Sequence, residues 1–531
     1  MRTSESWCAG SRSPAQMVRL LVPILFALFA LVPSVLSADL ATSNQFHFEV
    51  VLKPGLLAAP VDGRLFVVIA QTNYPEPRIA LERTGPDAPQ SLARDLKGFS
   101  SGTIAILDQN AFAFPVTNIS LLPTGDYVIQ AVFDSNSDLR SPNSPGNLYS
   151  SPLNLRLDFT HSQTARLELT GQIPPEELPA ETGQIKFAKI QSKLLTQFHG
   201  RPIFLRAGVI LPRDYDRDPA RRYPLWVRIG GFNTRYRSVV NLMNEGSQFR
   251  KTWLADDTPR FILLQLDGAG PLGDSYQMDS DNNGPYGEAL IRELIPEIEA
   301  RFRAAAQPRA RFLSGTSTGG WVALALQVFY PDFFNGAWSS CPDPVDFRSF
   351  ELVNIYDDEN AFTDKNGNER ASERDLQGRV VLTMRQEVGA ENLLGRGNSY
   401  VSSGGQWGVW NAVYGPRGPD ALPVPLWDPH SGKINRTVAE HWKKYDLRLV
   451  LDQNWNILAL KLRGKLHIAS GEADQYFLNN AVHLLDESLR PGKPPLDAKI
   501  AFGPGKGHGW SNLSMRQMLD EMKTAADRTM P

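Results

Sequence analysis

The chain has few cysteines, no excess of charge of either sign and no apolar run long enough for a membrane-spanning helix. Its 531 residues contain two cysteines, Cys8 and Cys341. Cys8 falls in a segment that we expect to be removed, so we expect no intrachain disulfide. We interpret Cys341 as a small buried apolar residue, a common role of free cysteine.

The charge balance argues against partners that are held mainly by charge. The chain has 55 lysines and arginines against 57 aspartates and glutamates, a formal net charge of -2. Because no basic excess is present to neutralise a phosphate backbone, we expect no nucleic-acid partner. The remaining composition, 42% hydrophobic and 21% charged, is that of a globular protein, and the length predicts two or more folded units.

Residues 1–38 have the pattern of a signal peptide. Arginines precede an apolar run and small residues follow it: Arg2, Arg12, Arg19, the run 20–32, Ser34, Ser37 and Ala38. A charged start, an apolar middle and a small-residue cleavage site are typical of exported proteins. The run is too short for a membrane anchor, so we predict a secreted or periplasmic protein without stable membrane insertion. A start at Met17 would give a more compact signal of the same kind.

The rest of the chain divides into a β-rich part and an alternating part. Residues 39–171 contain short β-type runs between turn residues, which predicts a small β-sandwich as an accessory domain. Residues 172–183 carry three prolines and are interpreted as a linker. From residue 184 to 531, apolar strand-like runs alternate with helical ones. This alternation predicts a mostly parallel sheet with helices on both faces.

One long segment interrupts the alternation. Residues 342–462 are aromatic and rich in turn residues, and they lie between two predicted strands. We interpret this segment as an insertion that forms a cap over a site. Its tryptophans are expected either to line a substrate pocket or to pack in a core: Trp407, Trp410, Trp427, Trp442 and Trp455.

The strongest local motif is the hexapeptide Gly-Thr-Ser-Thr-Gly-Gly at residues 315–320. It follows a strand-like run at 310–314 and precedes an apolar helical run, the context that the G-x-S-x-G motif requires. The serine must occupy a tight, strained turn, and its neighbours must lack a Cβ to avoid a clash. We therefore predict that Ser317 is a nucleophile.

Two later loops supply the partners that a serine nucleophile requires. Asp474 follows the strand-like run 466–470, and His508 follows the run 499–502. Both positions fall where open α/β sheets place their sites. We predict that His508 takes the serine proton and that Asp474 fixes the imidazole tautomer. The order serine, acid, histidine predicts an α/β-hydrolase fold for residues 184–531.

The acid and the oxyanion hole leave alternatives open. Glu472, Asp343 and Asp346 are the other candidates for the acid, because each also follows a predicted strand. The N–H of Thr318, directly after the nucleophile, is the first expected oxyanion donor. A second donor is expected from Gly231 or Phe232, after the strand-like run 225–229.

One segment has part of the pattern of a calcium-binding loop. The segment 279–284 matches the first half of an EF-hand loop, but the twelfth position is Leu290, so the bidentate glutamate ligand is missing. We interpret it as a polar loop that leads into a helix.

The residues 314–334 around Ser317, the helical run 293–298 and the loop 507–510 resemble the putative-esterase family, which includes esterase D and enterochelin esterases. The resemblance covers residues 184–531 apart from the insertion, and the β-rich part is similar to the accessory domain of enterochelin-type members. It implies carboxylic-ester hydrolysis without metal or cofactor, and it supports Ser317, Asp474 and His508. Two features depart from it: many members have His-Gly where this chain has Gly230-Gly231, and the insertion is unusually long.

We therefore predict a secreted serine esterase whose partner is a small-molecule or carbohydrate ester, such as a sugar or siderophore ester. An acyltransferase of the mycolyltransferase kind or a peptidase is the first alternative, because a triad does not distinguish water from other acceptors. A non-catalytic binding protein that retains the fold is the second.

Overall fold

The computed structural model describes residues 46–528, which contain two large sheets. The predicted signal peptide lies outside the described residues. Within the described part of the chain, no helix is both long and apolar enough to cross a bilayer.

The first part of the chain forms a mostly antiparallel nine-stranded sheet. Its elements are β1 (His47–Leu52), β2 (Val61–Ala70), α1 (Pro77–Ala80), β3 (Gln90–Phe99), β4 (Ile104–Leu107), β5 (Phe112–Phe114), β6 (Gly125–Asp134), β7 (Leu148–Ser150), β8 (Leu153–Leu157) and β9 (Thr164–Gln172). The order is β4-β1-β9-β7-β6-β2-β3-β5, with β8 on β6, and only β1 and β9 among these pairs are parallel. One buried cluster takes side chains from β1, β2, β6 and β9, including Phe48, Leu65, Ile129 and Leu167. This all-β architecture agrees with the expected β-rich part.

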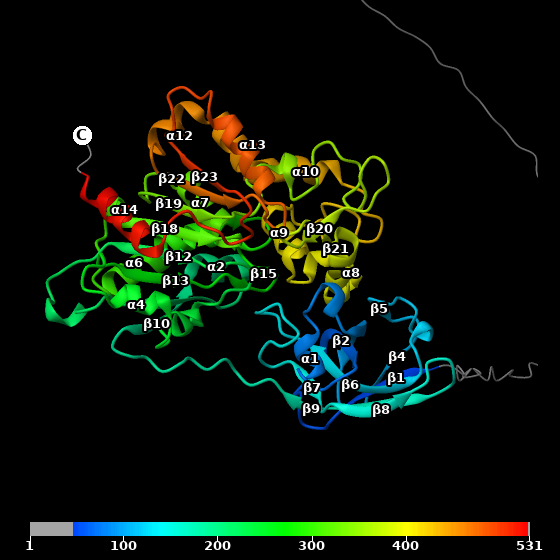
Figure 1. The fold of residues 1–531 in the computed structure, drawn as a ribbon. Coiled ribbons are helices and arrows are strands. Elements are labelled where there is room, and N and C mark those ends of the chain that lie inside the picture. Colours follow the sequence, from blue (N-terminus) through cyan, green and yellow to red (C-terminus); the bar gives the residue numbers. More distant parts are fainter. Residues whose placement is uncertain (1–45, 529–531) are drawn as a thin grey trace, which may run out of the picture. The chain divides into compact units, whose positions relative to one another are not determined.

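After residues 173–184, which form neither helix nor strand, an eight-stranded sheet begins. Its strands are β10 (Ile185–Ser192), β11 (Ile203–Ile210), β12 (Leu225–Ile229), β13 (Ile262–Leu266), β18 (Arg311–Thr316), β19 (Ala337–Ser340), β22 (Leu466–Gly471) and β23 (Lys499–Gly503). Two hairpins of two-residue strands precede β18: β14 (Ala269–Gly270) with β15 (Gly273–Asp274), and β16 (Asp279–Ser280) with β17 (Gly284–Pro285). The strand order is β10-β11-β13-β12-β18-β19-β22-β23 (Figure 1). β11 alone runs opposite to the other seven strands, which is the arrangement typical of α/β-hydrolases and confirms the predicted fold class.

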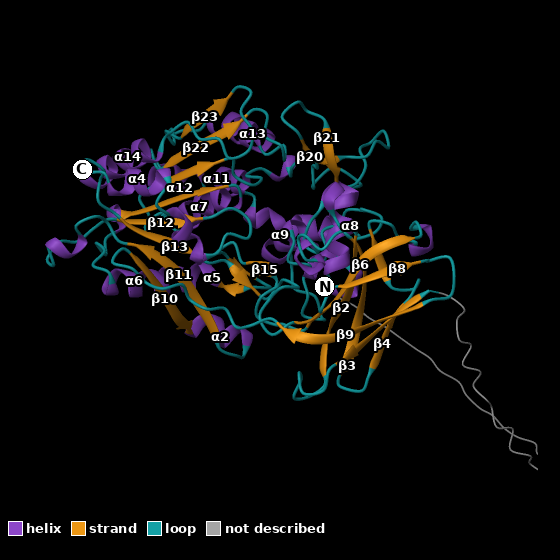
Figure 2. Ribbon diagram, turned by 60° about the horizontal axis from the view of Figure 1, so that its bottom comes forward, coloured by secondary structure: helices purple, strands orange, loops and turns teal. Residues whose placement is uncertain are grey.

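Helices cover both faces of this sheet, as Figure 2 shows. They are α2 (Lys193–His199), α3 (Val239–Leu242), α4 (Gln248–Leu254), α5 (Tyr286–Ala289), α6 (Ile295–Arg301), α7 (Thr318–Phe329), α13 (Asn479–Leu489) and α14 (Met515–Asp527). Successive strand residues point to opposite faces. Thus Leu225 and Val227 join the core beneath α7 and α13, whereas Trp226 joins a second core with α4 and α14.

The segment 342–462 lies between β19 and β22. It contains β20 (Ala371–Arg374), β21 (Val380–Thr383), α8 (Met384–Leu394), α9 (Gln406–Tyr414), α10 (Arg436–Trp442), α11 (Leu447–Gln453) and α12 (Trp455–Lys461). Trp407, Trp410, Trp427 and Trp442 are at most 2% exposed, and the rings of Trp407 and Trp427 meet edge to face at 4.8 Å. These four tryptophans therefore pack in a core, and Trp410 also reaches the pocket described below.

The register of the parallel strands sets the position of the site. Thr316 pairs with Ser340, Ser340 with Ala469, and Gly471 with Gly503. Because these residues lie at the carboxyl ends of four adjacent strands, the loops that follow all leave the sheet at one edge. Ser317 directly follows β18, Asp474 lies in the loop after β22, and His508 lies in the loop after β23.

Candidate active site

Ser317 lies at a strained turn between β18 and α7. Its φ of 59° and ψ of -128° lie in a backbone region that residues with a Cβ rarely adopt. It occupies the N-terminal end of α7, where the first backbone N–H groups have no partner within the helix. The turn therefore places a half-buried hydroxyl at a helix end whose backbone N–H groups have no partner within the helix.

The glycines around Ser317 are required by close backbone approach. A Cβ on Gly315 would lie 2.0 Å from the carbonyl oxygen of Gly319, and a Cβ on Gly319 would lie 2.4 Å from those of Ile229 and Gly230. Backbone atoms cannot give way as a flexible side chain can. The G-x-S-x-G pattern thus lets β18 and α7 meet directly against the end of β12.

His508 and Asp474 form the hydrogen bond that a catalytic dyad requires. The distance from His508 Nδ1 to Asp474 Oδ2 is 2.9 Å, and the Asp474 side chain is fully buried. Burial lowers the pKa of His508, but the hydrogen bond and charge of Asp474 and the charge of Asp343 outweigh it, so the net pKa is raised. The backbone N–H of His508 also donates to Gln475 Oε1 at 2.7 Å, which fixes the loop.

The other three candidate acids have different partners. Glu472 bonds to His483 at 3.1 Å, and Asp346 pairs with Arg348 and Arg448. Asp343 lies beside the nucleophile, where its Oδ1 accepts a long hydrogen bond of 3.5 Å from Ser317 Oγ. In this structure the serine hydroxyl therefore donates to Asp343 and not to His508.

Asp343 is the centre of a buried polar cluster that the sequence analysis did not anticipate. Its Oδ2 accepts hydrogen bonds from Tyr276 (2.5 Å), Thr318 Oγ1 (3.1 Å) and Trp410 Nε1 (3.1 Å). Burial raises the pKa of Asp343, whereas these three donors lower it, and the net direction is upward. Tyr276 and Trp410 come from distant segments with no motif, so only the folded chain brings them together.

The nucleophile and the histidine open into one pocket of about 530 Å³. Ser317, Asp343 and His508 line it together with Phe232 and Asn233 from the loop after β12 and Trp410 and Tyr476. The insertion supplies much of the remaining lining, through residues such as Glu351, Ser372, Glu387 and Gln406. The pocket is therefore built by the sheet edge, the insertion and residues of the β-rich part such as Glu82 and Arg140.

The predicted oxyanion donors lie around Ser317. Thr318 is the first residue of α7, so its N–H belongs to the unpaired end of the helix. A Cβ on Gly231 would lie 3.7 Å from Ser317 Cβ, and Phe232 lines the pocket. The turn at 231–234 is closed by a hydrogen bond from Thr234 N to Gly231 O. The three candidates thus surround the serine, and their role as donors stays a prediction.

Within the described residues, one group of three potential metal ligands lies close together: Cys341, Asp474 and His508, with ligand atoms within 4.8 Å of one another. Burial raises the pKa of the Cys341 thiol to about 11, so the thiolate that binds metals is disfavoured. Asp474 and His508 are also bonded to each other. The donor set therefore favours an acid–base pair over a metal site.

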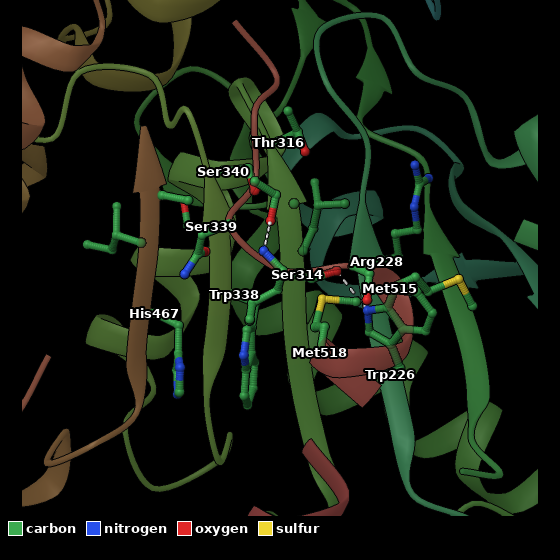
Figure 3. Close-up of a pocket in the computed structure, with 18 of the residues that line it drawn as sticks. Trp226, Arg228, Ser314, Thr316, Trp338, Ser339, Ser340, His467, Met515 and Met518 are labelled. Carbon is green, nitrogen blue, oxygen red and sulfur yellow. Dashed lines mark hydrogen bonds between the residues drawn. The ribbon is translucent and has the colours of Figure 1, made fainter. Parts of the chain in front are cut away.

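A second cavity, of about 270 Å³, lies against the sheet face covered by α14 (Figure 3). Trp226, Ser314, Trp338, His467 and Met518 line it, whereas Ser317, Asp474 and His508 do not. Trp226 Nε1 donates to Ser314 Oγ at 2.7 Å, and the His467 ring stacks on Trp338. Burial lowers the pKa of His467 to about 4. Because Ser314 and His467 are both held by neighbouring tryptophans, this cavity is a weaker site candidate.

Comparison with known proteins identifies a matching family. The family described as "Putative esterase" matches residues 205–482, a segment that contains Ser317 and Asp474 and ends before His508. A search of curated proteins finds no match.

Several solved structures are similar to the chain. They include a ferulic acid esterase (13% identity, TM-score 0.38, covering 65% of this chain and 96% of the other). They also include an S-formylglutathione hydrolase from Agrobacterium tumefaciens (13% identity, TM-score 0.36, covering 66% and 97%). A third is FphF, a fluorophosphonate-binding serine hydrolase from Staphylococcus aureus (12% identity, TM-score 0.35, covering 65% and 100%).

Proposed function

Because the chain belongs to the putative esterase family, we propose that it cleaves carboxylic esters, with Ser317 as nucleophile, His508 as base and Asp474 as the acid that orients the base. The observation that carries the proposal is the 2.9 Å bond between His508 and Asp474 in the same pocket as the strained Ser317. A buried carboxylate on Nδ1 leaves Nε2 free to accept a proton.

The reaction proceeds in two displacements. Ser317 Oγ attacks the ester carbonyl while His508 Nε2 takes its proton, and the tetrahedral oxyanion is stabilised by the N–H of Thr318 and a backbone N–H of the 231–232 turn. His508 then returns the proton to the leaving alkoxide, which leaves an acyl-enzyme. Water attacks this ester while His508 Nε2 takes a proton from it. The second tetrahedral intermediate then collapses, the C–O bond to Ser317 breaks, His508 returns the proton to Ser317 Oγ, and the carboxylic acid leaves.

The contact between Ser317 and Asp343 is compatible with this sequence of steps. At 3.5 Å the Oγ–Oδ1 hydrogen bond is at the limit of useful length, so its loss costs little. Rotation of the serine side chain about χ1 releases the hydroxyl from Asp343 and turns it toward the imidazole.

We propose further that the protein is exported and acts on a small-molecule or carbohydrate ester, such as a sugar or siderophore ester. The signal-peptide pattern of residues 1–38 supports export, and the N-terminal sequence of the mature protein tests it. A mature chain that still begins at Met1 or Met17 would contradict export.

The proposed nucleophile is tested by labelling with a fluorophosphonate probe and measuring intact mass. The wild type and Ser511→Ala, which removes an exposed serine, are expected to gain one adduct, whereas Ser317→Ala is expected to gain none. Hydrolysis of p-nitrophenyl acetate should fall by at least about 10³-fold in Ser317→Ala alone.

Two outcomes would decide against the proposal. An adduct on Ser317→Ala would place the nucleophile elsewhere, and no adduct or hydrolysis with the wild type would favour a non-catalytic binding protein. Transfer of the acyl group to an added sugar in preference to water would favour an acyltransferase.

A further inference from the structure

The pocket that holds Ser317 has more acidic than basic side chains. Six carboxylates line it: Glu82, Asp343, Glu351, Glu373, Glu387 and Glu391. The two arginines in the lining, Arg140 and Arg235, already form ion pairs with Asp134 and Asp267, each at 2.6 Å. The arginines therefore do not neutralise the glutamates, and the pocket carries an uncompensated capacity for negative charge.

Of these acids, Glu351 has the least favourable environment for a charged carboxylate. Its side chain is 3% exposed, and its Oε2 has no hydrogen-bond partner among the described residues. Its backbone also adopts a φ of 53°, which is strained for a residue with a Cβ. A buried, unpartnered carboxylate on strained backbone is unfavourable, and such strain concentrates at sites that bind ligands.

Neighbouring glutamates make the ionised form of Glu351 still less favourable unless a positive charge is bound nearby. Glu391 accepts hydrogen bonds from Ser403 Oγ, Trp407 N and Gly408 N, at 2.7 to 2.8 Å, and Glu387 accepts one from Trp407 Nε1 at 2.9 Å. Burial raises the pKa of Glu351, and the charges of Glu387 and Asp343 raise it further. Burial and the charge of Glu387 raise the pKa of Glu391 to about 8. A cation in the pocket would relieve this repulsion.

The geometry favours an organic cation over a metal ion. In the described part of the chain, the one group of three metal-ligand side chains with ligand atoms within 4.8 Å of one another is Cys341, Asp474 and His508, which does not include these glutamates. The rings of Trp410 and Tyr476 line the same pocket. Aromatic side chains and dispersed carboxylates together suit an alkylammonium group, which is larger and softer than a metal ion.

We propose that Glu351, together with Glu373, Glu387 and Glu391, binds a positively charged amine of the ester substrate while Ser317 attacks the ester carbonyl. This proposal rests on the proposed esterase function and specifies its substrate class. The charged amine can belong to either the alcohol or the acyl part, and the experiment addresses both.

The test compares kcat/KM for two pairs of esters that differ in charge but hardly in size. Acetylcholine is paired with its isostere in which carbon replaces the nitrogen, and the p-nitrophenyl ester of aminohexanoic acid with that of heptanoic acid. We expect the cationic member of at least one pair to be preferred by about tenfold or more, the value of one charge-assisted hydrogen bond.

The variant Glu351→Gln should clearly reduce this preference, although Glu373, Glu387 and Glu391 remain in the pocket. The control Glu359→Gln, whose side chain is 87% exposed in the same insertion, should retain it. The readout is the ratio of kcat/KM for two esters measured on the same enzyme. A general loss of activity in Glu351→Gln lowers both values equally and leaves this ratio unchanged. If that variant fails to fold, the preference of the wild type still decides the substrate class.

The outcomes separate this proposal from the function on which it rests. A wild type that hydrolyses the neutral esters without preference for either cationic partner overturns the cation site and leaves the esterase intact. If the wild type hydrolyses none of the four esters and is not labelled by the fluorophosphonate probe, the proposed function itself is overturned. A preference that is undiminished in Glu351→Gln overturns the assignment of Glu351.

Discussion

At the scale of single residues, the charge state of His508 controls when the proposed nucleophile can act. Burial lowers the pKa of the imidazole, but the hydrogen bond and charge of Asp474 and the charge of Asp343 raise it above its ordinary value. Only the neutral imidazole accepts the serine proton. Since the pKa is raised, the neutral form is gained at a higher pH than for a free histidine, and kcat/KM should rise with pH along a limb centred above about 6.5.

Replacing Asp474 should both slow the enzyme and move that limb. In Asp474→Asn we expect kcat/KM for p-nitrophenyl acetate to fall by about 10³- to 10⁴-fold, because the imidazole loses its orienting carboxylate. The pH limb of the residual activity should be centred at a lower pH. Burial lowers the pKa of His508, and in this variant the carboxylate of Asp474 no longer raises it. Glu472→Gln is the matched control, because Glu472 bonds to His483 instead, and we expect less than about a threefold change. A larger loss in Glu472→Gln than in Asp474→Asn would reverse the assignment.

For Ser317, Asp474 and His508, the sequence predicted the order along the chain and the position in a loop better than the side-chain contacts. Ser317, Asp474 and His508 could be proposed because each follows an apolar strand-like run, and parallel strands bring such loops to one edge. The choice among four acids remained open because side-chain direction within a loop depends on backbone detail, such as the φ of 43° at Cys341 just before Asp343. Tyr276 and Trp410 carry no local signal, since their role comes only from a shared contact with Asp343.

At the scale of elements, the strands that lead into the site loops were predicted, whereas β10 and β11 at one side of the sheet were not. The runs predicted at 225–229 and 466–470 agree with β12 and β22 to within one residue, because buried parallel strands are nearly continuous apolar segments. The run predicted at 499–502 agrees equally well with β23, although β23 is an edge strand. The apolar residues of β10 alternate with Lys186, Lys189 and Gln191, so β10 has no continuous apolar run.

The contact between α7 and β12 should tolerate no added methyl group. In Gly319→Ala, the new Cβ would lie 2.4 Å from two backbone oxygens, so α7 must move away from β12 and take Ser317 with it. We expect a loss of about 1–3 kcal/mol in the free energy of unfolding and a fall of at least about 10²-fold in kcat/KM. Urea denaturation and ester hydrolysis measure these effects.

Gly246→Ala is the control for that substitution, because no atom lies within 4 Å of its added Cβ and its φ is not positive. We expect it to leave both quantities within experimental error of the wild type. A fully active Gly319→Ala would mean that the close approach of α7 to β12 does not position the nucleophile.

At the scale of the whole molecule, the β-rich part supports a wall of the pocket. The last carbonyl groups of a helix lack partners within the helix and carry partial negative charge. At the end of α8, Leu393 O accepts from Arg64 Nε at 2.8 Å and Leu394 O accepts from Arg140 Nη2 at 2.7 Å. Both arginines come from the first part of the chain, and α8 carries Glu387 and Glu391 of the pocket. The β-rich part therefore supports the pocket through the end of α8, and it also lines the pocket directly through Glu82 and Arg140.

Removing Arg140 should weaken the fold and the pocket together. The side chains of Arg140 and Asp134 are 6% and 0% exposed, so Arg140→Met leaves a buried carboxylate without its cation and frees the end of α8. We expect a loss of about 3–5 kcal/mol in the free energy of unfolding and a lower kcat/KM for esters. Arg201→Met breaks a more exposed pair with Asp138 and should cost at most about 1 kcal/mol. If Arg140→Met instead lowered stability while kcat/KM stayed at the wild-type value, the β-rich part would serve the fold without shaping the site.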